Sequence, residues 1–92
     1  MKLKIEASNL VTKRYFLIDS EGVKFYESAF IGGHHRFGFN EIQCILMSSD
    51  NILSFQVKQE VFSIPIKPGK KKHKHVIDVF VNEVKRTNVS TV

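Results

Sequence analysis

The sequence predicts a mainly β domain in which seven short strands are followed by one C-terminal helix. The chain has 92 residues and a mass of 10.6 kDa, which is enough for one domain and too little for two. Apolar and polar residues alternate along most of it, as in strands with one buried face. After Pro68-Gly69 the apolar spacing lengthens to that of a helix. We therefore expect one domain over residues 1–86 and a frayed tail over residues 87–92.

The first hairpins follow from alternation and turn chemistry. A first strand is expected over residues 2–7 and a second over residues 11–18. Residues 19–22 are typical of a hairpin turn, because Asp19 can accept hydrogen bonds from the nearby backbone and Gly22 tolerates positive φ. The third strand then runs over residues 23–27. The residues expected to face inward on the first and third strands are Leu3, Ile5, Ala7, Val23 and Phe25, and those expected to face outward are Lys2, Lys4, Glu6, Lys24 and Tyr26.

The middle of the chain is predicted as a loop and two further strands. A loop over residues 28–36 surrounds Gly32-Gly33, a short fourth strand covers residues 37–39, and residues 40–41 make a brief turn. A fifth strand follows over residues 42–47 and ends in a turn at residues 48–51. Cys44 alternates with Ile42 and Leu46, so we expect it to be a small core residue.

The last strands and the helix complete the prediction. The sixth strand covers residues 53–58, a hairpin turn lies at residues 59–60, and the seventh strand covers residues 61–66. Pro65 has no N–H to donate, so this seventh strand is expected at a sheet edge. The stripe that indicates a helix consists of Val76, Ile77, Phe80, Val81 and Val84. Its β-branched residues leave an eighth strand as the alternative.

Composition excludes several classes of protein. No stretch approaches the roughly 18 apolar residues of a membrane span. The first six residues carry a charge at every second position, so they contain no apolar signal-peptide core. Cys44 is the single cysteine, which excludes an intramolecular disulfide and predicts a reducing, cytoplasmic setting.

The net charge of +5 is concentrated in one segment. Residues 67–75 hold five lysines and no acidic residue, and the rest of the chain is balanced. Four of these lysines lie at or just before the expected start of the helix, where the helix dipole disfavours cations by roughly 0.3–1 kcal/mol each at most. That arrangement indicates an anionic partner, and a merely solubilising loop is the alternative. The predicted anion-binding residues are Lys67, Lys70, Lys71, Lys72 and Lys74, with Lys13 and Arg14 as accessories.

Three short motifs add a family resemblance. They are residues 15–23 (YFLIDSEGV), residues 39–42 (FNEI) and residues 62–66 (FSIPI). Together with the strand order and the terminal helix, they make residues 2–86 resemble the pleckstrin-homology-like (PH-like) superfamily, in particular its bacterial members. The resemblance implies a seven-stranded barrel of two antiparallel sheets, with one open end closed by the C-terminal helix.

The resemblance also implies binding rather than catalysis. Members recognise phosphoinositide head groups, peptides or proteins, and several bacterial ones self-associate. The lipid-binding members use spaced basic residues on the first two strands. Lys4, Lys13 and Arg14 occupy that region here, whereas Tyr15 stands where a third basic residue is expected.

Other readings of the sequence remain as alternatives. A small nucleic-acid-binding barrel would use the same lysines and stack bases on Tyr26, although its helix usually lies between the third and fourth strands. The apolar runs at residues 15–18 and 44–47 predict a covered outer face, which a second subunit could supply. Phe30 and Phe37 flank the Gly-Gly loop. The histidine pairs, His34-His35 and His73-x-His75, read as loop residues rather than as metal ligands.

The sequence therefore predicts a non-enzymatic binding or scaffolding module. We expect a protein partner or self-association, an anionic lipid surface as a further partner, and nucleic acid or self-assembly alone as the alternatives. No cofactor, metal or small-molecule substrate is expected. The expected location is the cytoplasm, including a peripheral position at a membrane.

Overall fold

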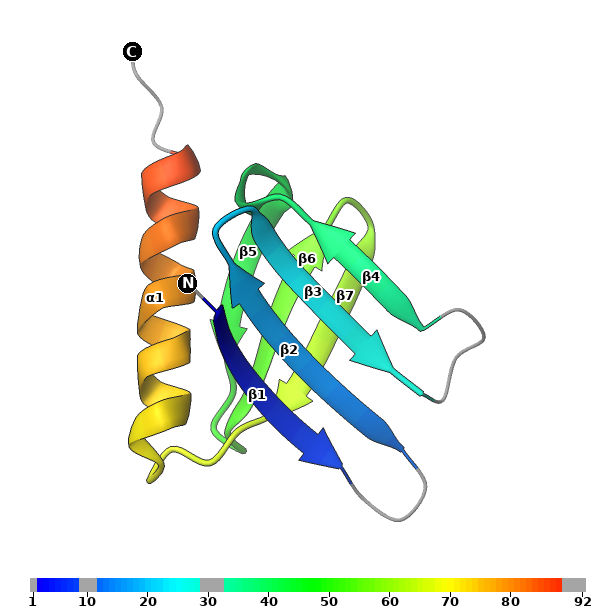
Figure 1. Ribbon diagram of the computed structural model, residues 1–92, viewed down its shortest axis with the longest axis vertical. Coiled ribbons are helices and arrows are strands. Elements are labelled where there is room, and N and C mark those ends of the chain that lie inside the picture. Colours follow the sequence, from blue (N-terminus) through cyan, green and yellow to red (C-terminus); the bar gives the residue numbers. More distant parts are fainter. Residues whose placement is uncertain (1, 9–11, 29–32, 89–92) are drawn as a thin grey trace.

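A computed structural model describes residues 2–8, 12–28 and 33–88 of the chain. The described residues form two antiparallel sheets and a C-terminal helix that lies beside both of them (Figure 1). The elements are β1 (Lys2–Ser8), β2 (Lys13–Asp19), β3 (Gly22–Glu27), β4 (His34–Phe37), the 3-10 helix η1 (Phe39–Glu41), β5 (Ile42–Met47), β6 (Ile52–Val57), β7 (Glu60–Pro65) and α1 (Lys71–Asn88). The mainly β prediction with one C-terminal helix is confirmed. The predictions for residues 9–11, 29–32 and 89–92 concern Val11, Phe30 and part of the tail, and these residues lie outside the described ones.

The first sheet has the strand order β1-β2-β3-β4. One inward row pairs Ile5 with Phe16, Phe16 with Phe25 and Phe25 with His35. The hairpin turn between β2 and β3 forms as expected, because the Asp19 carboxylate accepts the N–H groups of Glu21 and Gly22 at 2.8 and 3.1 Å. The predicted faces of β1 and β3 are confirmed, since Ile5, Val23 and Phe25 are buried.

The fourth strand lies earlier in the chain than predicted. β4 covers His34–Phe37, residues that were mostly assigned to the loop, and its ladder with β3 extends back to Gly33, whose carbonyl accepts the N–H of Glu27 at 3.0 Å. Of the strand predicted over residues 37–39, only Phe37 lies in a strand, because Phe39–Glu41 forms η1 instead. The reason is a cap: the Glu41 carboxylate accepts the N–H of Gly38 at 2.7 Å and turns the chain into a helical conformation.

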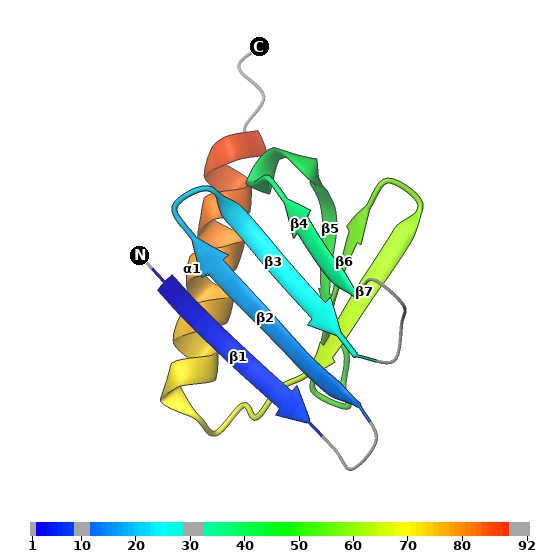
Figure 2. The same ribbon diagram turned by 45° about the vertical axis from the view of Figure 1, so that its right-hand side comes forward.

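The second sheet has the order β5-β6-β7, so β7 is an edge strand, as Pro65 predicted. The fifth strand has the predicted limits, Ile42–Met47. The turn between β6 and β7 contains no glycine, and Lys58 itself adopts a φ of +57° there. No ladder joins the two sheets within the described residues, so the observed architecture is two facing sheets and a helix (Figure 2).

Cys44 is exposed, and its assignment to the core is wrong. The register of β5 against β6 shifts between Ile42 and Cys44, which is a β-bulge. The extra residue reverses the alternation, so Ile42 and Ile45 face inward while Cys44 and Leu46 face outward.

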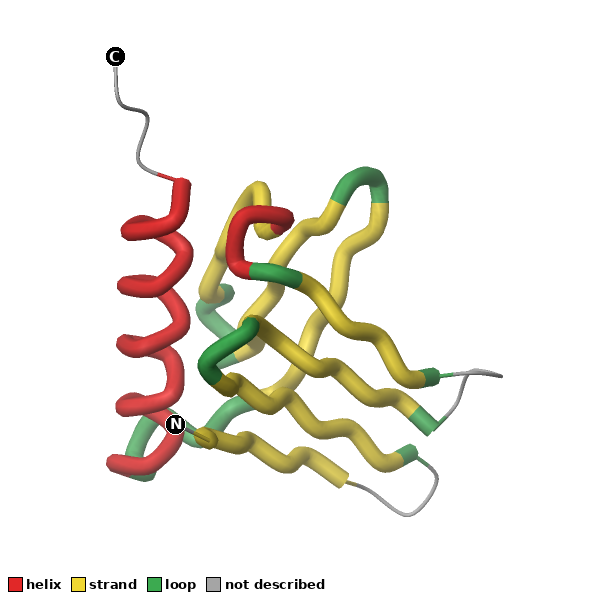
Figure 3. The backbone as a smooth tube through the Cα atoms, turned by 45° about the horizontal axis from the view of Figure 1, so that its top comes forward, coloured by secondary structure: helices red, strands yellow, loops and turns green. Residues whose placement is uncertain are grey.

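The helix closes the core on one side of the two sheets (Figure 3). Val76 and Phe80 on its predicted stripe are fully buried. The Phe80 ring packs edge-on against Phe16 at 4.9 Å and against Phe55 at 5.6 Å between ring centroids, so it joins both sheets. The alternative of an eighth strand is therefore excluded.

Candidate anion-binding site

The five lysines of the basic segment surround the start of α1. Lys67 and Lys70 lie in the turn before it, and Lys71, Lys72 and Lys74 lie in its first turn. All five are exposed, and none forms an ion pair with a carboxylate among the described residues. The turn is ordered by backbone bonds, since Lys70 donates to the carbonyl of Lys67 at 3.0 Å and Lys74 donates to that of Lys70 at 3.1 Å. The first turn of the helix holds no acidic residue to offset the charge.

His73 lies at the centre of this segment and is almost fully buried, with 6% of its surface exposed. Its Nδ1 accepts the backbone N–H of Lys67 at 3.0 Å, which places the proton of the neutral ring on Nε2. Burial lowers the pKa of His73, and the nearby charges of Lys70, Lys67 and Lys72 lower it further. The interpretation of His73 as a loop residue is wrong. Its spacing of three and seven residues from Val76 and Phe80 is the signal that places it on the buried stripe.

A hollow of about 500 Å³ adjoins this segment, between the ends of β1 and β2 and the connection from β7 to α1. Arg14, Lys67 and His73 line it together. Its other lining residues are Glu6, Ala7, Ser8, Thr12, Pro65 and Ile66. The structure thus brings Arg14 and Lys67, two predicted site residues far apart in the sequence, to one place.

The Arg14 guanidinium is only partly used within the chain. One terminal nitrogen donates to the Glu27 carboxylate at 3.1 Å, while the buried Nε has no hydrogen-bond partner. An unpartnered buried N–H is costly, so this part of the Arg14 side chain is not fully stabilised by the contacts within the chain. Lys13 is exposed at the start of β2 and does not line the hollow.

Lys4, which the family resemblance placed among the basic residues, is already engaged. Its ammonium lies 2.8 Å from the Glu6 carboxylate and 4.7 Å from the centre of the Tyr15 ring. This contact lowers the pKa of Glu6, and Lys72 adds a smaller effect in the same direction. Lys4 therefore contributes little free positive charge.

The aromatic row on the outer face of the first sheet is stacked upon itself. The rings of Tyr15 and Tyr26 lie 5.2 Å apart at 23°, and Tyr26 lies 4.4 Å from His34. His34 and His35 project to opposite sides of β4, and His35 packs on Phe62 at 4.9 Å. The Tyr15 and His34 rings also lie 6.5 Å apart, and the Tyr15 hydroxyl lies 3.5 Å from His34 Nδ1, so the three rings form one cluster on this face.

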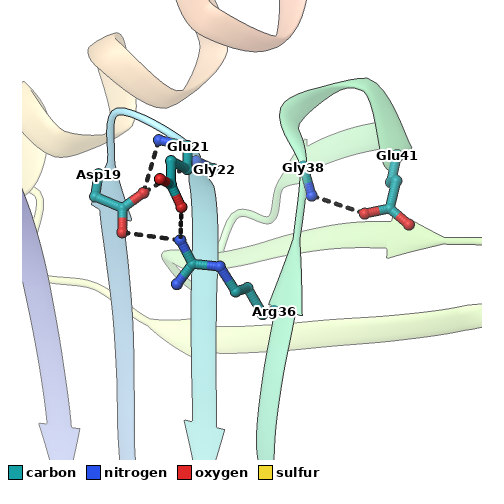
Figure 4. A network of polar contacts seen from close by, with 6 residues as sticks. All are labelled: Asp19, Glu21, Gly22, Arg36, Gly38 and Glu41. Atoms are coloured by element: carbon teal, nitrogen blue, oxygen red, sulfur yellow. Dashed lines mark hydrogen bonds and ion pairs between the residues drawn. The ribbon is translucent and has the colours of Figure 1, made fainter.

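At the other end of the first sheet, two carboxylates of the turn between β2 and β3 contact an arginine of β4 (Figure 4). Arg36 pairs with Asp19 at 3.3 Å and with Glu21 at 2.9 Å. The backbone N–H of Glu21 lowers the pKa of Asp19, and Arg36 and the Gly22 N–H act in the same direction. These carboxylates are thus structural parts of the turn.

No family model, no curated protein and no solved structure matches this chain. Among the described residues, no cluster of three or more potential ligands is placed to hold a metal ion. In the same part of the chain, neither helix is long and apolar enough to cross a membrane. The case for a function therefore rests on the basic segment and the hollow beside it.

Proposed function

We propose that this chain is a non-enzymatic binding module of the PH-like type that attaches to the phosphate groups of an anionic membrane surface. The observation that carries the proposal is the set of five exposed lysines without ion pairs, continuous with a hollow that Arg14 and His73 line. The seven strands and the C-terminal helix support the PH-like assignment. As part of this proposal, the two sheets close into a barrel. The cytoplasmic face of a membrane is the corresponding location.

The two parts of the site have different roles. Near an anionic bilayer each lysine contributes about 1 kcal/mol, so five contribute at most about 5 kcal/mol, which corresponds to a dissociation constant of roughly 0.2 mM. This attraction is long-ranged and not specific. The hollow adds Arg14, Lys67 and His73 as lining residues, whose N–H groups are the kind of donor that binds one phosphate.

The test is co-sedimentation with vesicles of phosphatidylcholine alone or with added phosphatidylserine, over a series of salt concentrations. One variant carries Gln at Lys70, Lys71, Lys72 and Lys74. The matched control removes the same charge elsewhere, with Gln at Lys2, Lys24, Lys58 and Lys85, four exposed lysines outside the segment. We expect the wild type and the control to bind anionic vesicles at low salt, and the first variant to lose at least ten-fold in binding.

Two results would contradict the proposal. Equal losses in the two variants would show that only net charge matters. If the wild type does not bind anionic vesicles at low salt, the lysines instead serve to bind an acidic protein partner or to keep the protein soluble.

A further inference from the structure

The outer face of the second sheet carries no charge, although charged residues make up 25% of the chain. Two central rows of cross-strand neighbours cover this face, Leu46–Ser54–Ser63 and Cys44–Gln56–Val61. A third row adds Ile52 and Pro65. By contrast, one row on the outer face of the first sheet holds Lys4, Lys24 and Arg36.

The apolar side chains on this face are exposed and its polar ones are satisfied within the chain. Leu46 and Val61 each expose 63% of their surface. The hydroxyls of Ser54 and Ser63 bond to each other at 2.8 Å, and the Gln56 amide donates to the carbonyl of Lys58 at 2.8 Å. Covering the face would therefore bury apolar surface with few polar groups losing their partners.

We propose that this face binds the same face of a second copy of the chain. A net charge of +5 makes two copies repel each other, and the three rows on this face hold no charged side chain that would add to this repulsion at the contact itself. The face is also complementary to itself in side-chain size. A two-fold axis along β6 exchanges β5 with β7, so Leu46 of one copy lies over the small Ser63 of the other, and Val61 lies over the small Cys44.

This axis covers all three rows, with Ile52 opposite Ile52 of the second copy. A two-fold axis across the strands, centred between the two main rows, would instead place Ile52 and Pro65 opposite the charged turn at Lys58. Three strands about 4.8 Å apart and six residues long give an area of roughly 300 Å² per copy. Stable interfaces bury about 800 Å² per partner, so we expect a weak pair that forms at high micromolar concentration or above.

Oxidative cross-linking of a Val61→Cys variant tests the arrangement. Within one chain β6 separates Cys44 from position 61, and two strand spacings of about 10 Å are too long for a disulfide. We expect a disulfide-linked dimer in which peptide mapping joins Cys44 to position 61. The double variant Cys44→Ser/Val61→Cys should lose it. A Leu46→Cys variant tests the other axis. A disulfide between position 46 of one copy and Cys44 of the other would indicate the axis across the strands and overturn the axis along β6.

Sedimentation at up to about 1 mM protein tests the pair without cross-linking. A Leu46→Lys variant should weaken association at least ten-fold, while Ser20→Lys, which adds the same charge in the exposed turn of the first sheet, should not. Circular dichroism confirms that each variant is folded. A wild type that stays monomeric throughout, and that gives no cross-link as Val61→Cys, would overturn the inference. Added salt weakens membrane attachment but not this pairing, so the failure of one proposal can be distinguished from the failure of the other.

Discussion

At the scale of single residues, the fold depends on the missing side chain of Gly22. Its φ is +151°, and a Cβ there would lie 2.1 Å from the carbonyl oxygen of Phe37. We expect Gly22→Ala to lower the free energy of unfolding by roughly 2–4 kcal/mol, because both the backbone conformation and the approach of β4 are disturbed. Urea denaturation measures this change. Gly69→Ala is the control, since a Cβ at Gly69 meets no atom within 4 Å, and a loss of equal size there would contradict the explanation.

His73 makes the stability of the fold depend on pH. Its pKa in the folded chain is lowered from the usual 6.5, so the unfolded chain binds a proton first as the pH falls. The stabilisation from the neutral ring is complete above pH 6.5 and is lost as the pH falls from there through the folded pKa. We expect His73→Asn, which keeps an acceptor for the Lys67 N–H, to show a flatter fall in unfolding free energy between pH 7 and 5. Equal slopes in chemical denaturation would contradict this origin.

At the scale of elements, Phe80 packs α1 against both sheets. This ring is fully buried and packs against Phe16 and Phe55, one from each sheet. We expect Phe80→Ala to lower the free energy of unfolding by about 3–5 kcal/mol. Val79→Ala, beside it but off the buried stripe, should change it by less than about 1 kcal/mol. Guanidinium denaturation of both variants compares them, and similar losses would show that the helix has no defined inner face.

The strands were predictable wherever alternation and turn chemistry agree. The turn at Asp19 and Gly22, the limits of β5, the edge position of β7 and the helix all follow from local pattern. The errors at residues 34–36 and at Cys44 occur where a long-range contact decides the conformation. β4 forms because β3 offers a partner edge, and a bulge reverses the face on which Cys44 lies. The local sequence contains no signal here for the strand partner of β4 or for the bulge in β5.

At the scale of the whole molecule, the charge pattern was predictable and the site geometry was only partly so. The five lysines stand together in the sequence, so their common location needed no fold. The meeting of Arg14 with Lys67 and His73 depends on how β2 packs beside the connection to α1. Such proximity between residues more than fifty positions apart appears only once both sheets are placed.

The course of the chain after β7 has a consequence for a symmetric pair. The basic segment begins two residues after Pro65, at the end of the second sheet where Met47 and Ile52 also lie. A two-fold axis that runs along β6 maps this end onto itself, so both copies present their lysines toward the same plane. Two weak contacts linked in this way act at an effective concentration in the millimolar range. The fraction of protein bound to a charged surface would then rise steeply with protein concentration, because only the pair combines both contacts. Attachment would begin only above the concentration at which the pair forms.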